Sequence, residues 1–296
     1  MKLRIAILLS VLCIASALAQ NAGTYMLRYK YTPGYVSGLK LSFITNGEVF
    51  RQEENNPMQV DMKWVGLMTL KIVSVDKHGN ANIVVAVKSA TKTLMGQVTK
   101  QTAPKDKLTV IKMTVDPLGK VIGKPTISGV PPMPGIDTDT MLQGVYLFGV
   151  PLPSQAVRVG DSWTAKTAVP SHATSGAKKP LVMAKLTCSL VKLDTFKGSL
   201  VYRIKVESEV PMTMEMPGFG ANSKPIMTGK GIGKSSMEYL LSRDKLYLLS
   251  GAGDLQVNMK IEMMDMSAPT GKTEMKVNTN STVNMIRSAA KAKPKK

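Results

Sequence analysis

The sequence predicts a protein that is all-β, or mainly β with one short helix. Apolar and polar residues alternate along many stretches, which is typical of antiparallel strands with one buried and one wet face. Turn signals such as Thr32-Pro33-Gly34 separate these stretches, and helix signals are scarce. The hydrophobic fraction of 44% is enough for a folded core. We expect antiparallel meander sheets, in which two similar halves could form a curved half-barrel or a sandwich.

The first 19 residues have the parts of a secretory signal peptide. Lys2 and Arg4 form a positive start, an apolar run follows, and residues 17–19 match the small-x-small pattern of a cleavage site. The apolar run is shorter than the ~20 residues that a membrane-spanning helix needs. We therefore expect an exported protein, periplasmic or extracellular, that is cleaved near Ala19 and has no transmembrane segment after cleavage.

Residues 20–123 form the N-terminal half of the predicted fold. The alternation there has period two, and the sequence from Asp76 to Asn80 is a turn signal between two strands. The predicted strands cover residues 25–31, 39–43, 60–64 and 83–87, and a strand–turn–strand hairpin covers residues 113–123.

Residues 124–156 are rich in proline and glycine and are predicted to connect the two halves. Proline is a poor residue for a central strand, so we expect this connector to pack on the surface. It could include one short helix, with Asp137 or Thr138 as the N-cap before apolar positions that end near Tyr146.

Residues 157–286 form the C-terminal half, which shares a strand–turn–strand pattern with the first. Whether the halves make one domain or two stays open. Cys188, the only cysteine left after signal cleavage, lies on an apolar alternating face and is expected to be a buried small hydrophobe. The predicted strands cover residues 182–190, 200–206, 255–263 and 275–285, with a hairpin at 240–251, loops at 170–180 and 217–233, and a disordered basic tail at 287–296.

Recognisable catalytic motifs are missing from the sequence. The two histidines, His78 and His172, both lie in turn-like or loop-like sequence. The glycine-rich run at 229–235 resembles a phosphate loop, but Thr228 stands where that motif requires glycine. The acidic pairs lie in polar sequence and fit solvated faces. We therefore predict no enzyme activity and no cofactor.

Methionine is unusually frequent, with 21 residues. Methionines at every second position place their thioethers on one side of an extended strand, about 6.8 Å apart. Two interpretations stay open: a Cu(I) site made of soft ligands, and an apolar lining, because methionine fills adaptable apolar pockets. The lack of histidine in the methionine clusters favours the apolar lining, and no metal ligand is assigned. The predicted ligand-binding residues are Met212, Met214, Met216, Met259 and Met263.

The net charge of +19 fits two interpretations, anionic partners or solubility alone. Lysine is a poor bidentate reader of bases, and aromatic residues are only 5% of the chain, so nucleic acid is not expected as a partner. Lipid headgroups and acidic envelope polymers fit better. The residues predicted to contact an anionic surface are Lys291, Lys293, Lys295 and Lys296. The oligomeric state is left open.

Three segments carry a resemblance to known proteins: TYMLRYKYTPGY at 24–35, PLPSQAVRVGDSWTAK at 151–166, and the run at 229–251. In their pattern they are similar to uncharacterised exported bacterial β-rich proteins of unknown function. That group has no assigned activity, so the resemblance implies no catalytic residue. Our leading hypothesis is an exported, non-enzymatic envelope protein that binds an amphiphile or another envelope component on an apolar β face. The alternatives are a basic structural protein that docks on anionic envelope polymers, and a methionine-rich copper-binding protein.

Overall fold

The computed structural model describes most of the chain between residues 23 and 288. The described ranges are 23–51, 57–94, 96–102, 109–129, 146, 150–169, 172–173, 182–216, 226–244, 246–264 and 272–288. The predicted signal peptide, the helix expected before Tyr146, and the lysines from Lys291 to Lys296 lie outside these ranges.

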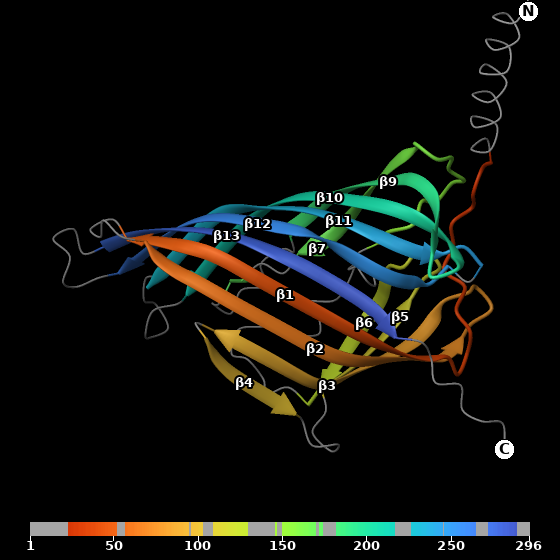
Figure 1. The fold of residues 1–296 in the computed structure, drawn as a ribbon, viewed down its shortest axis with the longest axis horizontal. Helices are drawn as coiled ribbons and strands as arrows, with labels where there is room; N and C mark the ends of the chain where they lie inside the picture. The colour runs from red at the N-terminus through yellow and green to blue at the C-terminus, as the bar shows by residue number, and fades with distance from the viewer. Residues whose placement is uncertain are drawn as a thin grey trace, which may run out of the picture.

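Thirteen strands pair into one sheet (Figure 1). They are β1 (Val36–Arg51), β2 (Met58–Val75), β3 (Ala81–Leu94), β4 (Gln97–Thr102), β5 (Thr109–Val115), β6 (Val121–Ser128), β7 (Ser162–Val169), β8 (His172–Ala173), β9 (Val182–Phe196), β10 (Ser199–Met216), β11 (Met227–Ser242), β12 (Leu248–Met264) and β13 (Lys272–Ser288). The main path runs β6-β5-β3-β2-β1-β13-β12-β11-β10-β9-β7, with β4 beside β3 and β8 beside β10. Within the described ranges, the two end strands of this path do not pair with each other, so the sheet is open.

The predicted fold class is confirmed. Every strand pair along the main path is antiparallel, and only the short β8 runs parallel to its neighbour β10. The two halves of the chain belong to one continuous sheet, because β1 pairs with β2 on one side and with β13 on the other. Figure 1 shows the sheet curving so that β5 and β6 at one edge and β7 at the other lie behind the central strands.

Four local predictions are wrong. The segment at 25–31 is not a strand: within the described ranges its only bridge joins Tyr25 to Val157, and it lies against the sheet with Leu27 and Tyr29 buried in the core. Its alternation therefore reflects which side chains it buries. Its backbone bonds to loop residues, Pro117 and Val157, and not to a strand of the sheet. The loop expected up to residue 233 ends earlier, since β11 begins at Met227.

The third correction concerns the connector, which was expected on the surface. Its first residues belong to the edge strand β6. Pro125 lies in a bulged part of the pairing with β5, where its lack of an N–H does not remove a ladder hydrogen bond. Its last residues are buried: Val150 has no exposed surface, and Leu152 donates its N–H to the carbonyl of Leu118 at 3.0 Å. The indole Nε1 of Trp163 also donates to the carbonyl of Pro151 at 2.9 Å. Apolar side chains and these bonds hold the segment inside the curve of the sheet.

The fourth correction concerns the tail that was expected to be disordered from residue 287. Arg287 and Ser288 still belong to β13, where they pair with Leu39 and Gly38 of β1.

The core lies on one side of the sheet, which we call the inner face. One cluster of buried side chains includes Leu190, Ile204, Tyr239 and Val283, and a smaller cluster forms around Ile83 between β2, β3 and β5. Cys188 is buried in the larger cluster, as the sequence predicted, and burial raises the pKa of its thiol to about 12. In the described part of the chain, no helix is long and apolar enough to span a membrane.

Candidate ligand-binding face

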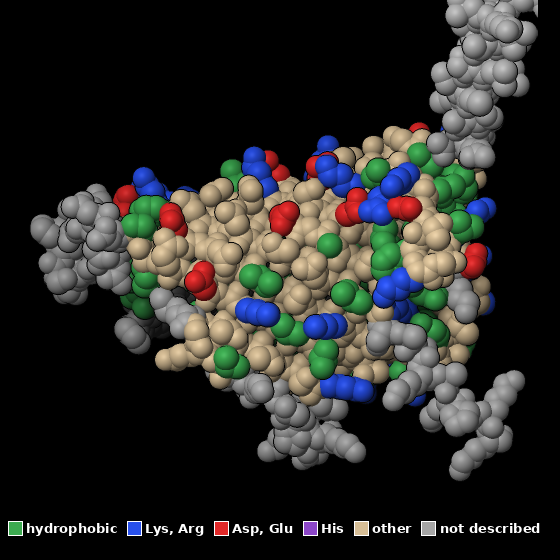
Figure 2. Space-filling view, viewed as in Figure 1, with side chains coloured by type: hydrophobic (Ala, Val, Ile, Leu, Met, Phe, Trp, Pro, Cys, Tyr) green, Lys and Arg blue, Asp and Glu red, His purple; other side chains and the backbone are tan. Residues whose placement is uncertain are grey.

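The two faces of the sheet differ in polarity. Residues that pair directly across neighbouring strands point to the same face, so the printed register assigns each position. Figure 2 shows polar and charged side chains, with scattered hydrophobic ones, over β1, β2, β12 and β13. On β12, for example, Gln256 and Asn258 are exposed, whereas Val257 and Met259 are half-buried on the other side. The apolar residues therefore concentrate on the inner face.

A row of hydroxyl groups crosses the middle of the inner face. The register aligns Thr45, Ser281, Leu255, Ser235 and Ser208 across β1, β13, β12, β11 and β10. The hydroxyls of Thr45 and Ser281 are 2.8 Å apart and both residues are buried; those of Ser235 and Ser208 are also 2.8 Å apart. Each pair satisfies its own hydrogen bond, and the apolar Leu255 lies between the two pairs, so the hydroxyl row is interrupted in its middle.

Beyond the hydroxyl row, the inner face is lined by methionine and valine. We call these residues the methionine face; all are half-buried except Ile261, which is 7% exposed. None of them belongs to either core cluster. The methionine face consists of Val49, Val60, Met212, Met227, Val257, Met259, Ile261, Met263, Met275 and Val277. It is a contiguous apolar surface that the core does not use.

The register brings the predicted methionines of β10 and β12 onto this one face. Met212 and Met259 both pair with Gly231 of the strand between them. Met216 and Met263 both pair with Met227, which the sequence analysis did not single out. The side chains of Met214 and Met216 lie outside the described part of the structure, so their strand positions alone are assigned.

A strip of glycines between the two clusters was missed by the sequence analysis. Gly229, Gly231 and Gly233 occupy inner-face positions of β11, where alternating residues would otherwise carry side chains. A Cβ on Gly231 would stand 2.2 Å from the carbonyl oxygen of Asn258, and one on Gly233 would stand 3.1 Å from Sδ of Met212. Gly229 and Gly233 are themselves buried, and the thioether of Met212 lies over Gly233, so the strip lets β12 and Met212 pack closely on β11. The spacing of these glycines at every second residue could have revealed the strip, but the run was compared only with a phosphate loop.

The structure bears on the copper interpretation through the position of one histidine. Among the described residues, no group of three or more His, Cys, Asp and Glu could hold a metal ion. The backbone of His172, in β8, pairs with Met214 of β10 in parallel register. A histidine that is distant in the sequence therefore lies on the strand next to Met214, although no histidine is close to the methionines of β10 in the sequence. The other histidine, His78, lies exposed in the turn between β2 and β3.

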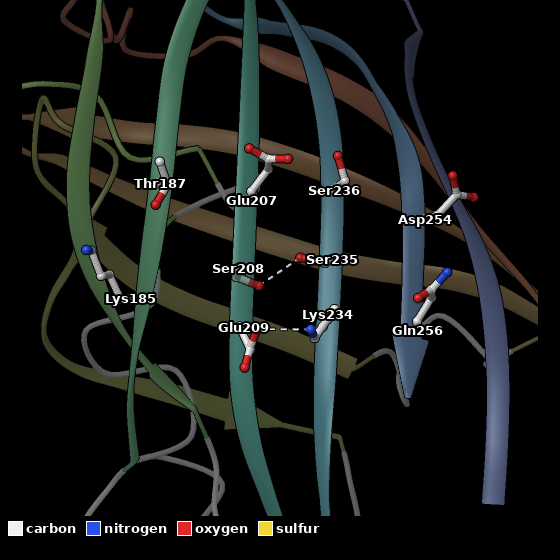
Figure 3. A pocket seen from close by; sticks show the side chains of 10 residues that line it. All are labelled: Lys185, Thr187, Glu207, Ser208, Glu209, Lys234, Ser235, Ser236, Asp254 and Gln256. Atoms are coloured by element: carbon white, nitrogen blue, oxygen red, sulfur yellow. Dashed lines mark hydrogen bonds and ion pairs between the residues drawn. The ribbon is translucent and has the colours of Figure 1, made fainter. Parts of the chain in front are cut away.

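A polar hollow lies on β9, β10, β11 and β12 (Figure 3). Its volume is about 570 Å³, and two lysines and three carboxylates line it. Lys234 pairs with Glu209 at 3.3 Å, and Lys205 pairs with Glu207 at 2.6 Å. These charges neutralise one another, so the hollow does not concentrate the positive charge of the chain. The lysine tail predicted to contact anionic surfaces lies outside the described residues.

Comparisons with known proteins give no family for this chain. No family model matches it, and no curated protein matches its sequence. Among solved structures, a lipovitellin structure titled for lipid–protein interactions is similar with a TM-score of 0.42 and 8% identity over 90% of this chain. The chain spans 26% of the length of that lipovitellin chain. Pseudomonas aeruginosa OccK2 (OpdF) gives a TM-score of 0.24 with 5% identity, covering 85% of this chain and 97% of the other.

Proposed function

We propose that the protein is an exported, non-enzymatic binding protein that holds an amphiphile with its apolar chain on the methionine face. The observation that carries the proposal is the methionine face itself: a contiguous apolar surface that lies beyond the hydroxyl row and belongs to neither core cluster. Apolar surface of this kind marks a site for a ligand or a partner.

The composition of the face suits flexible alkyl chains. Methionine has three rotatable bonds and a polarisable sulfur, so it adapts to irregular apolar shapes. The methionine face extends along β12 from Val257 to Met263, which at about 3.4 Å per residue is about 20 Å. Burying about ten methylene groups there contributes about 8 kcal/mol before the cost of association. Only the surplus over that cost, which is about 4 kcal/mol or more, appears as affinity.

Export and charge fit the same proposal. The segment at 1–19 has the pattern of a secretory signal, and the chain carries 39 Lys+Arg against 20 Asp+Glu. A basic protein is attracted to anionic lipid headgroups, which brings it to membranes where amphiphiles are available. The apolar face then supplies the selectivity for the alkyl chain.

Titration with a fluorescent fatty acid, dansyl-undecanoic acid, tests the proposal. Gln replaces Met with little change in size but makes the face polar, so Met259→Gln/Met263→Gln should weaken binding at least tenfold. Met264→Gln is the matched control, because Met264 is next in the same strand but is 49% exposed on the opposite face. Equal affinities in the two variants, or no binding to the wild-type protein, would overturn the proposal.

The two alternatives give different results in simple assays. Docking on anionic polymers predicts binding to dextran sulfate that collapses between low and moderate salt, because surface charges are screened. A copper protein predicts Cu(I) binding that Met259→Gln/Met263→Gln weakens while the fatty acid does not bind. Either pattern, seen without fatty acid binding, would replace the amphiphile proposal.

A further inference from the structure

A second cavity lies on the inner face at the opposite end from the methionine face. It is partly open to solvent, with a volume of about 120 Å³, and it sits where the start of β1, the end of β13 and the β11–β12 turn meet. Leu70, Ile72 and Ile83 form an apolar wall, and Arg287 together with several tyrosines forms the other side. An arginine in a cavity of this kind needs an explanation, because burial of a charged group is unfavourable without a partner.

Arg287 is held between two aromatic rings. Its Cζ is 4.7 Å from the centre of the Tyr35 ring and 4.3 Å from the centre of the Tyr247 ring. Its Nη1 donates a hydrogen bond to the carbonyl of Leu248 at 3.2 Å. These contacts fix the plane of the guanidinium between β1 and the β11–β12 turn.

One donor of this fixed guanidinium has no partner. Nε of Arg287 is buried and makes no hydrogen bond, and within the described ranges no carboxylate forms an ion pair with the residue. Burial lowers the pKa of Arg287. The ordinary pKa of arginine is so high that the guanidinium nevertheless stays protonated. The structure thus holds a rigid, charged donor without a counter-ion beside an apolar wall.

Two of the tyrosine hydroxyls that line the cavity are already occupied. The hydroxyl of Tyr29 donates to the carbonyl of Val150 at 3.3 Å, and that of Tyr31 donates to the carbonyl of Asp116 at 3.0 Å. Lys30 lines the cavity as well but is exposed, so it adds positive charge from the solvent side. The field in the cavity therefore favours one anionic group at Arg287.

We propose that this cavity binds a small apolar carboxylic acid, with its carboxylate on Arg287 and its apolar body against Leu70, Ile72 and Ile83. A carboxylate is the planar anion that accepts charge-assisted hydrogen bonds from a guanidinium edge, and a cavity of this size is close to the ~150 Å³ that holds a benzene molecule. An acid of the size of benzoate or hexanoate exceeds this volume, so part of it lies in the opening of the cavity beside Lys30. It is independent of the methionine face, and neither proposal needs the other.

Calorimetric titration with benzoate tests the site, with benzamide as the neutral probe of the same shape. We expect benzoate to bind the wild-type protein and benzamide to bind at least tenfold more weakly. Arg287→Met should abolish benzoate binding, because it keeps an unbranched apolar chain but loses the charge. Arg158→Met is the matched control, since Arg158 is exposed and lies outside the cavity. Met259→Gln/Met263→Gln should leave benzoate binding unchanged.

A second readout keeps the test decisive should Arg287→Met fail to fold. In the wild-type protein, the ¹⁵Nε–H resonance of Arg287 should move on addition of benzoate and stay in place on addition of benzamide. The proposal is overturned by equal binding of the two probes, by unchanged affinity in Arg287→Met, or by an Nε–H signal that does not respond to benzoate or hexanoate at 10 mM. Arg287 would then only clamp the β11–β12 turn to β1.

Discussion

The glycine strip makes a sharp prediction, because two of its members face different neighbours. In Gly231→Ala, the new Cβ would stand 2.2 Å from the carbonyl oxygen of Asn258 and 2.7 Å from Cα of Met259. Both are backbone atoms of a paired strand, so relief requires moving β12 away from β11. In Gly233→Ala, the new Cβ meets only the flexible thioether of Met212, with Sδ at 3.1 Å.

The expected magnitudes follow from these contacts. Overpacking against backbone costs about 3 kcal/mol at the upper end of its usual range. Replacing glycine by alanine returns about 0.4–1 kcal/mol by restricting the unfolded chain. Gly231→Ala should therefore lower the free energy of unfolding by about 2 kcal/mol. Gly233→Ala should change it by less than about 1 kcal/mol, because a rotamer adjustment of Met212 costs about 0.5–1.5 kcal/mol and offsets the same gain.

Urea unfolding followed by circular dichroism measures both variants against the wild-type protein. The account requires a clear gap between them, with Gly231→Ala the less stable. Equal midpoints for Gly231→Ala and Gly233→Ala would refute the reasoning. Such a result would mean that β12 moves away from the inner-face backbone of β11 at little cost, and that the strip is not a close-packed floor.

Three further predictions concern groups elsewhere in the sheet. Because burial raises the pKa of the Cys188 thiol to about 12, iodoacetamide at pH 8 should not label the folded protein but should label it in 6 M guanidinium; rapid labelling of the folded form would contradict the burial. Hydrogen bonds from Arg203 lower the pKa of Asp194 from 3.8 to about 2, so this carboxylate stabilises the fold above about pH 4 and its contribution disappears as the pH falls toward 2. Asp194→Asn should flatten the pH dependence of the melting temperature in that window, and an unchanged acid limb would count against the pairing. Thr45→Val should cost about 1–3 kcal/mol because it leaves the Ser281 hydroxyl buried and unpaired, whereas Thr45→Val/Ser281→Ala should recover most of the loss in urea unfolding; additive losses would refute the coupling.

The strands could be predicted from the sequence because each has one face in the core. Period-two alternation in β1, β10 and β12 follows directly from burial on a single face. The same alternation misled at 25–31, because an extended segment packed against a sheet buries every second residue without pairing. Alternation reports which face is buried, and it does not report which strand lies alongside.

Pairing between distant strands could not be predicted. The contact of β1 with β13 joins residues such as Phe43 and Val283, which lie far apart in the chain, and no turn between them fixes the register. Without that pair, the two halves could equally have been separate sheets. The burial of the end of the connector could not be predicted either. Proline content argues against a central strand, but it does not indicate whether a loop is buried.

The candidate site was predicted in part. The methionine spacing placed Met212, Met259 and Met263 on one face of their strands, and the register then brought the strands together. The glycine strip could be predicted only if residues 229–233 were known to form a strand. The cavity around Arg287 joins a turn, two strand ends and a loop, so no local pattern contains it.

Native mass spectrometry of the protein, purified gently from cells that produce it, is the most direct test of the amphiphile proposal. The account predicts a discrete added mass of lipid size on the wild-type protein and on Met264→Gln, and its loss from Met259→Gln/Met263→Gln. A protein without added mass, or one that carries only copper-sized increments, would contradict the claim that the methionine face holds an amphiphile.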